Sequence, residues 1–237
     1  METKGNIGQN EVVVEFGDIT KNRADAYVVP QFTGGASYGG VGGSIARSGA
    51  KNGLDLYQKF VDEKGEQKFG TVLLTESGGG NAKQLLHVVS VGSGNKDEFN
   101  TIQTAFYNVL KVAESKKLKE IAAPAMGTGI IGELTSEQSA RAMMSALEQY
   151  SKEGGKPIKV SFVIYGDKSA YEDFATTLKS ASYKETKKEA GGKEFDMGEW
   201  VVGMAKDADA NRRAFSKKHT KRDPLNSDGN GWDKGKQ

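Results

Sequence analysis

Hydrophobic and polar positions between residues 11 and 180 alternate between two kinds of pattern. Six short runs are rich in β-branched and aliphatic residues: Glu11–Phe16, Asp25–Pro30, Thr71–Thr75, Leu85–Val91, Glu120–Pro124 and Ile158–Tyr165. Several of these runs are almost continuously apolar, which is typical of strands that are covered on both faces. The pattern therefore predicts six strands, several of them in the interior of a sheet.

The segments between these runs carry apolar residues at helical spacing. In Asn100–Ala113 the apolar positions fall on one helix face, and Asn100 is the expected N-cap. Thr135 with Gln138 has the pattern of a capping box, and so does Ser169 with Glu172. Residues 44–60 are expected to form two short helices that are broken near Asn52-Gly53. Strands that alternate with helices predict an α/β protein.

We therefore expect a three-layer α/β/α sandwich with a mixed, largely parallel central sheet, plus a polar C-terminal tail. Residues 1–10 are expected to be a flexible N-terminus, and residues 11–180 to form the folded domain. Residues 181–237 are rich in charged residues and glycine and contain few large aliphatic side chains. We expect one helix from about Glu194 to Phe215 in this extension and disorder elsewhere.

The composition excludes several kinds of chemistry. The chain of 237 residues has no cysteine, so disulfides, thiolate zinc sites and thiol nucleophiles are excluded. His87 and His219 are its two histidines, which argues against a multi-histidine metal site, and we expect neither a metal nor a cofactor. The N-terminus has no signal-peptide pattern, and no apolar run approaches the ~20 residues of a membrane span. We expect a soluble, cytoplasmic protein that has no membrane partner.

A basic cluster lies in the C-terminal extension between residues 212 and 222. It consists of Arg212, Arg213, Lys217, Lys218, Lys221 and Arg222. A solvated tail is one interpretation, and contact with a nucleic acid or an acidic partner is the other. The net charge of the whole chain, +2, does not distinguish them.

Two glycine-rich loops follow predicted strands at what should be the same edge of the sheet. The first is Gly39–Ile45, and the second is Met126–Glu133, between the run Glu120–Pro124 and the helix expected from Thr135. Backbone N–H groups at the start of a helix attract anions. The pair of loops therefore indicates a site for an extended phosphate group. The alternative is that both loops are tight turns in which glycine serves the backbone geometry.

At this point the sequence resembles the macrodomains, a family that binds ADP-ribose. The resemblance spans roughly residues 11–180 and rests on the order of several loose motifs. These are Gly17–Thr20, Asp25-Ala26, Gly39–Ile45, Leu85–Gly92, Gly127–Gly132 and Val160–Asp167. It implies a protein that binds ADP-ribose, free or attached to a modified macromolecule.

The resemblance also implies roles for individual residues. Asp18, with Ile19 beside it, would accept the exocyclic amine of adenine, although Asp18 could instead cap a turn. Tyr165 would lie against the adenine, or else pack in the core, and His87 is interpreted as a structural histidine. The amides that would face the diphosphate and the distal ribose belong to Gly40, Val41, Gly42 and Gly43. The residues that would close over the other side are Gly127, Thr128, Gly129, Ile130, Ile131 and Gly132.

The sequence departs from the family where hydrolysis would occur. Many hydrolytic macrodomains carry an Asn-Ala-Ala-Asn stretch that orients the distal ribose, and here residues 29–32 read Val-Pro-Gln-Phe. Gln31, Ser37 or Tyr38 could be polar substitutes. Glu133 is the carboxylate near the second loop, and it is either a general base or a charge at a helix N-terminus.

Three functions follow from this departure. The first is binding of ADP-ribose with weak or absent hydrolysis, which we favour. The second is an ADP-ribosyl hydrolase, of glycohydrolase or esterase type, that removes ADP-ribose from protein or nucleic acid and uses the diphosphate itself, Glu133 or Tyr38. The third is an interaction scaffold with a degenerate ligand site.

Overall fold

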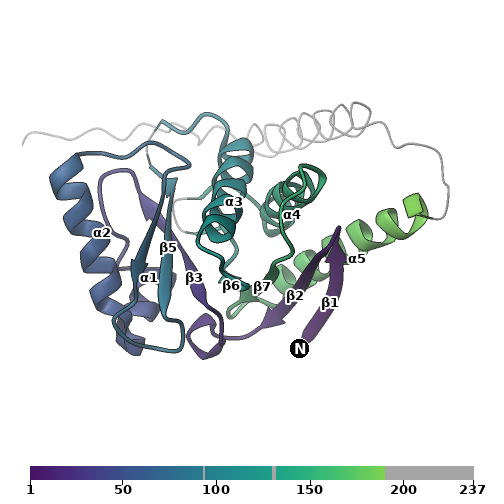
Figure 1. Cartoon of the computed structure of the whole chain (residues 1–237), viewed down its shortest axis with the longest axis horizontal. Coiled ribbons are helices and arrows are strands. Elements are labelled where there is room, and N and C mark those ends of the chain that lie inside the picture. Colours follow the sequence, from purple (N-terminus) through teal and green to yellow (C-terminus); the bar gives the residue numbers. More distant parts are fainter. Residues whose placement is uncertain (93, 130–131, 190–237) are drawn as a thin grey trace, which may run out of the picture. The chain divides into compact units, whose positions relative to one another are not determined.

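A central sheet of seven strands organises the part of the chain described by the computed structural model, which comprises residues 1–92, 94–129 and 132–189. The strands are β1 (Glu2–Ile7), β2 (Asn10–Phe16), β3 (Ala26–Phe32), β4 (Val72–Glu76), β5 (Gln84–Val91), β6 (Glu120–Ala123) and β7 (Lys159–Ile164). Their order in the sheet is β1-β2-β7-β6-β3-β5-β4 (Figure 1). The two edge strands, β1 and β4, run antiparallel to their neighbours, and the interior pairs are parallel.

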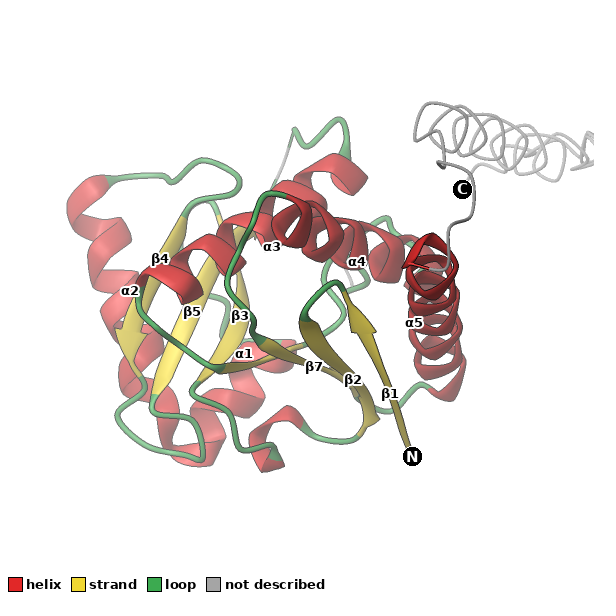
Figure 2. Ribbon diagram, turned by 45° about the vertical axis from the view of Figure 1, so that its right-hand side comes forward, coloured by secondary structure: helices red, strands yellow, loops and turns green. Residues whose placement is uncertain are grey.

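Helices cover both faces of this sheet (Figure 2). One face carries α3 (Glu98–Ser115), α4 (Ser136–Lys152) and α5 (Lys168–Glu189). The other carries α1 (Gly40–Ile45), η2 (Ala46–Ala50) and α2 (Lys51–Lys64). A single 3-10 turn, η1 (Ile19–Lys21), follows β2. The three-layer sandwich with a mixed, largely parallel sheet is thus confirmed.

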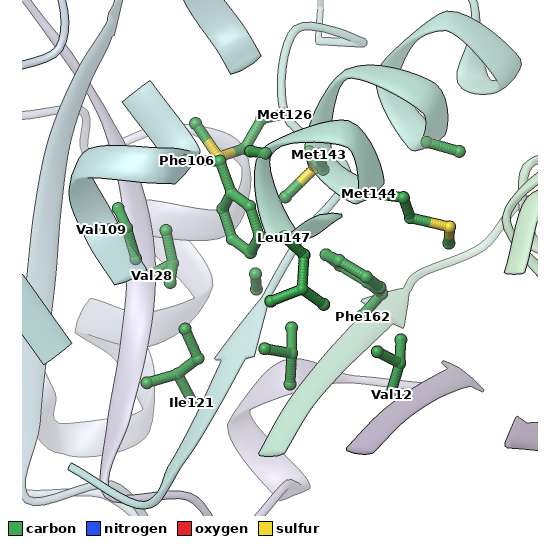
Figure 3. Close-up of a cluster of buried hydrophobic side chains, with 14 of the residues drawn as sticks. Val12, Val28, Phe106, Val109, Ile121, Met126, Met143, Met144, Leu147 and Phe162 are labelled. Atoms are coloured by element: carbon green, nitrogen blue, oxygen red, sulfur yellow. The ribbon is translucent and has the colours of Figure 1, made fainter. Parts of the chain in front are cut away.

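The core follows from the alternation of side chains along the strands. Val28 and Val29, neighbours on β3, are both fully buried but belong to different hydrophobic clusters, one on each face of the sheet. Figure 3 shows the cluster beneath α3 and α4, where the ring of Phe106 on α3 lies 5.6 Å from that of Phe162 on β7. Because strands of the interior are buried on both faces, they read as continuous apolar runs in the sequence.

The six strands expected from the sequence are present within two residues of the predicted bounds. The expectation of a flexible segment at residues 1–10 is not met, because Glu2–Ile7 forms β1. This strand pairs along its length with β2, buries Ile7 completely and packs against α5, where the Thr3 hydroxyl lies 2.9 Å from that of Tyr171. The sequence of β1 is polar because one face of this edge strand remains in solvent, so its hydropathy pattern does not predict a strand.

Helix starts are partly as expected. The capping box of Thr135 and Gln138 at the start of α4 is confirmed. The N-cap of α3 is Asp97 rather than Asn100, and the Asp97 carboxylate accepts the Asn100 N–H at 3.1 Å. At α5 the cap is likewise an aspartate, Asp167, two residues before the predicted Ser169. An ionised carboxylate interacts with the positive helix end more strongly than an amide or a hydroxyl does.

The helical segment after the first glycine loop is continuous through Asn52-Gly53, where a break was expected. The break lies at Gly49, whose φ of +107° interrupts η2, and Gly53 sits inside α2. At the other end of the chain, α5 runs past residue 180 to Glu189. The expected helix at Glu194–Phe215 and the basic cluster at residues 212–222 lie outside the described residues. Among the described helices, none combines the length and apolar character that crossing a membrane requires.

Candidate ligand-binding site

A cavity of about 890 Å³ opens where β2, β6 and β7 end and α1 begins. Parallel α/β sheets place their ligand sites at this carboxyl edge, and the volume is within the range of small-molecule sites. Its walls come from residues 18–21 after β2, from the exposed side of α1 and η2, from the segment after β6, and from the end of β7. The expected convergence of both glycine loops at one sheet edge is therefore seen in the fold.

Asp18 lines this cavity and also caps η1. One carboxylate oxygen, Oδ1, accepts hydrogen bonds of 2.9 Å from both the N–H and the hydroxyl of Thr20. The carbonyl of Thr20 in turn accepts a hydrogen bond of 2.8 Å from the Asn81 side chain, which ties η1 to the segment before β5. The second oxygen of Asp18 has no hydrogen-bond partner among the described residues. Both interpretations of Asp18 are thus compatible, since one oxygen caps the turn and the other is free to accept a ligand donor.

The first glycine loop forms the start of α1. Gly40 and Val41 line the cavity at the beginning of the helix, where N–H groups have no partner within the helix. Gly43 differs from the expectation, because its N–H donates to the Gly39 carbonyl at 3.0 Å. A Cβ on Gly42 would lie 1.9 Å from the carbonyl oxygen of Ser37, so the absence of a side chain lets the preceding backbone lie directly on the helix.

The second glycine loop follows β6 and leads to α4. Thr128 lines the cavity and Gly129 is exposed, whereas Ile130 and Ile131 lie outside the described residues. The N–H of Gly132 donates to the Gly129 carbonyl at 2.9 Å, so this amide serves the loop itself. A Cβ on Gly132 would lie 2.1 Å from the carbonyl oxygen of Gly127. In the described part of the loop, Gly132 therefore contacts the backbone of Gly127 and Gly129 and brings the two sides of the loop together.

Tyr165 projects from the end of β7 beside the cavity and is 80% exposed. That exposure excludes the alternative of core packing. The cavity is also lined by three residues for which the sequence predicted no individual role: Lys21, Ser44 and Arg47. The Arg47 guanidinium donates to the Ser44 hydroxyl at 3.1 Å. Two cationic side chains at this cavity favour an anionic ligand. Arg47 follows the first glycine loop and Lys21 follows the Gly17–Thr20 motif, and these positions are the signal that could have indicated them.

Comparison with known proteins identifies the family. A model of the Macro domain matches residues 32–143. The chain is 34% identical over 173 residues to an uncharacterized protein of Sulfolobus acidocaldarius, covering 73% of this chain and 93% of that protein. It is 30% identical over 156 residues to the O-acetyl-ADP-ribose deacetylase of Salmonella typhimurium, covering 65% and 87%. The chain belongs to the macrodomain family.

A solved structure shares the fold of this macrodomain. The macrodomain of Oceanobacillus iheyensis with ADP aligns with a TM-score of 0.68 at 22% identity, and the match covers 78% of this chain and 98% of the other. At this level of identity the similarity concerns the fold.

The two candidate catalytic residues of this macrodomain do not line the cavity. The Tyr38 hydroxyl donates to Asp55 at 2.8 Å, and the Lys51 ammonium lies 5.7 Å from the Tyr38 ring. Partial burial and the nearby Asp55 raise the pKa of Tyr38 to about 12. Glu133 is exposed, and its backbone N–H donates to the Glu98 carboxylate at 2.6 Å.

Gln31 and His87 are not among the residues that line the cavity, and both are fully buried. They are hydrogen-bonded to each other at 2.8 Å, so Gln31 does not supply a polar group to the cavity. Burial lowers the pKa of His87 to about 3, although the Gly53 carbonyl opposes this shift. His87 is thus a neutral, hydrogen-bonded residue of the interior, which agrees with its interpretation as a structural histidine.

Proposed function

We propose that this macrodomain binds ADP-ribose or a closely related ADP-ribosyl nucleotide, free or attached to a modified macromolecule. One observation carries the proposal. The same cavity has an acceptor-only carboxylate oxygen at Asp18 and the start of α1 at Gly40, with the cations Lys21 and Arg47 on its walls. An adenine amine needs an acceptor, and a diphosphate needs N–H groups and positive charge. The names of two similar proteins, a deacetylase of O-acetyl-ADP-ribose and a macrodomain with ADP, support this ligand class.

The ligand would extend from the end of β2 to the first turn of α1. The free oxygen of Asp18 would accept the exocyclic amine of adenine, next to Ile19, while the exposed ring of Tyr165 would stack on the base. The first amides of α1, at Gly40, Val41 and Gly42, would face the diphosphate. The second glycine loop, through Thr128, would close over the opposite side.

The surroundings favour binding over hydrolysis. Among the described residues, the carboxylates that line the cavity are Asp18 and Asp167, and both already cap the start of a helical turn. Glu133 is exposed outside the cavity lining, and the Tyr38 hydroxyl donates to Asp55. Catalysis requires groups whose interactions strengthen in the transition state, whereas amides at a helix start also stabilise a bound diphosphate in the ground state. The hydrolase remains the second candidate because the Salmonella relative carries a deacetylase name.

Calorimetric titration of the full chain with ADP-ribose tests the proposal. The Asp18→Asn variant keeps an oxygen that can accept from Thr20 but directs an amide NH₂ group toward the adenine amine. We expect its affinity to fall about 10- to 100-fold, since a hydrogen bond to a charged group contributes ~1.5–3 kcal/mol. Asp18→Ala should lose at least as much.

The base itself supplies the control. Inosine diphosphate ribose has a carbonyl in place of the exocyclic amine, so the wild-type protein should prefer ADP-ribose over it. The Asp18→Asn variant should show little preference. Absence of heat from folded wild-type protein with either nucleotide would overturn the proposal and favour the interaction scaffold.

A further inference from the structure

The backbone that leads into α1 is held by two glutamine side chains. The N–H of Ala36 donates to Oε1 of Gln58 at 2.9 Å, and the next N–H, of Ser37, donates to Oε1 of Gln31 at 2.5 Å. The Ser37 carbonyl packs against Gly42 so closely that no side chain fits there. The position of the first turn of α1 is therefore coupled to these two glutamines.

Gln31 is oriented from behind by a buried polar chain. Its Nε2 lies 2.8 Å from Nδ1 of His87, and Nε2 of His87 lies 2.9 Å from the Thr75 hydroxyl. That hydroxyl donates to the backbone carbonyl of Gly53 at 3.4 Å. This series of hydrogen bonds thus connects the Ser37 N–H to the Gly53 carbonyl of α2. The side chains that link them come from β3, β5 and β4.

The two backbone groups at the ends of this hydrogen-bond series determine which atom donates in each bond. A backbone N–H can only donate and a backbone carbonyl can only accept, so every hydrogen bond between Ser37 and Gly53 must point the same way. Gln31 then offers its oxygen to Ser37 and its NH₂ group to His87. His87 must be the neutral tautomer with its proton on Nε2. The His87 ring also stacks on Tyr57 at 4.9 Å, which fixes its plane.

We infer that Gln31, held in one orientation by His87, is a positioning residue for the diphosphate end of the nucleotide site. This inference rests on the proposed function. A Gln31 amide turned the other way would set its NH₂ group against the Ser37 N–H. Two donors would then face each other, the segment before α1 would be released, and the helix amides would lose their alignment. Neither Gln31 nor His87 contacts the cavity, so both act through the backbone.

A matched pair of variants tests this role in the full chain. Gln31→Met keeps the length of the side chain and removes its hydrogen bonds. Asn10→Leu removes an equally buried amide at the start of β2, where the Asn10 side chain donates to the Ile7 carbonyl at 3.0 Å and accepts from the Ile158 N–H at 3.1 Å. Both variants should lower the melting temperature. We expect only Gln31→Met to weaken ADP-ribose binding, about tenfold, while its affinity for adenosine, which lacks the diphosphate, stays at the wild-type value.

Two spectroscopic readouts test the geometry directly. Nitrogen-15 spectra of wild type should show His87 protonated on Nε2 alone. Amide hydrogen exchange at Ser37 should be slow in wild type and in Asn10→Leu but fast in Gln31→Met. Gln31→Glu should rescue both affinity and slow exchange, because its carboxylate can accept from Ser37 and from a protonated His87.

The outcomes separate the two proposals. Wild-type protein that fails to bind ADP-ribose would overturn the proposed function. The rate of amide hydrogen exchange at Ser37 would then still show whether Gln31 holds the backbone before α1. Binding by Gln31→Met equal to wild type would overturn the inference. Unchanged exchange at Ser37, or a His87 proton on Nδ1, would also overturn it.

Discussion

The hydroxyl of Ser139 on α4 donates a hydrogen bond of 2.6 Å to the carbonyl of Met126, the residue that begins the second glycine loop. Both residues are fully buried. The same helix is fixed at its start by the capping box of Thr135 and Gln138. Residues of α4 therefore restrain both ends of the second glycine loop, at Met126 after β6 and at Thr135 before the helix.

Replacing Ser139 by alanine should destabilise the protein by about 1–3 kcal/mol, because the buried Met126 carbonyl loses its donor. Ser90 provides the control, since its buried hydroxyl has no hydrogen-bond partner among the described residues. Ser90→Ala should change the free energy of unfolding by less than ~0.5 kcal/mol, or raise it slightly. Urea unfolding measures both. Equal losses in the two variants would contradict the role assigned to the Ser139 hydrogen bond.

Gly42→Ala should destabilise the fold by about 2–3 kcal/mol, as overpacking does, because the new methyl group would meet the Ser37 carbonyl oxygen at 1.9 Å. Gly39→Ala is the matched variant three residues earlier. A Cβ at Gly39 meets no atom within 4 Å, and φ there is −96°. Its thermal unfolding should lie close to that of wild type. A stable Gly42→Ala protein would show that the segment before α1 can move away at little cost.

The stability of the protein should fall between pH 7 and pH 5 through His87. Its pKa is about 3 in the folded protein and near 6.5 in the unfolded chain, so the unfolded state takes up the proton first. The contribution is complete above pH 6.5 and decreases by about 1.4 kcal/mol per pH unit as the pH falls toward 3. About 2 kcal/mol should be lost at pH 5.

His87→Leu, compared with wild type by urea unfolding at pH 7 and pH 5, isolates this contribution. The side chains that bond to or stack on His87 are Gln31, Thr75 and Tyr57, and none of them titrates between these pH values. The variant should be less stable at pH 7 but show a smaller pH dependence. An identical pH dependence in the two proteins would assign the acid sensitivity to other groups.

Glu133→Gln and Tyr38→Phe should leave any hydrolysis of O-acetyl-ADP-ribose or of an ADP-ribosylated peptide unchanged. Glu133 is exposed and Tyr38 is bonded to Asp55, so neither side chain is among those that line the cavity. Product release measured by chromatography, alongside ADP-ribose affinity, tests both variants. A Glu133→Gln protein that loses turnover but keeps its affinity would establish the hydrolase, with Glu133 as general base.

Much of the fold was accessible from local patterns. The runs around Val28 and Phe162 are apolar enough to predict buried strands, and Thr135 with Gln138 marked the start of α4 correctly. The predicted N-cap of a helix was wrong where two nearby residues are both suitable caps. Asp97 and Asn100 are both good caps, and the chain uses the aspartate three residues earlier.

The sequence by itself determined the layers of the fold and the meeting of two glycine loops at one sheet edge, because strand and helix periodicity are local and the carboxyl ends of parallel strands share an edge. Tertiary structure decided where the polar side chains go. Gln31 turns inward to His87, 56 residues away along the chain, and the Tyr38 hydroxyl turns to Asp55 on α2. The destination of a polar side chain depends on which donor or acceptor another element brings within about 3 Å, and local sequence does not encode that distance.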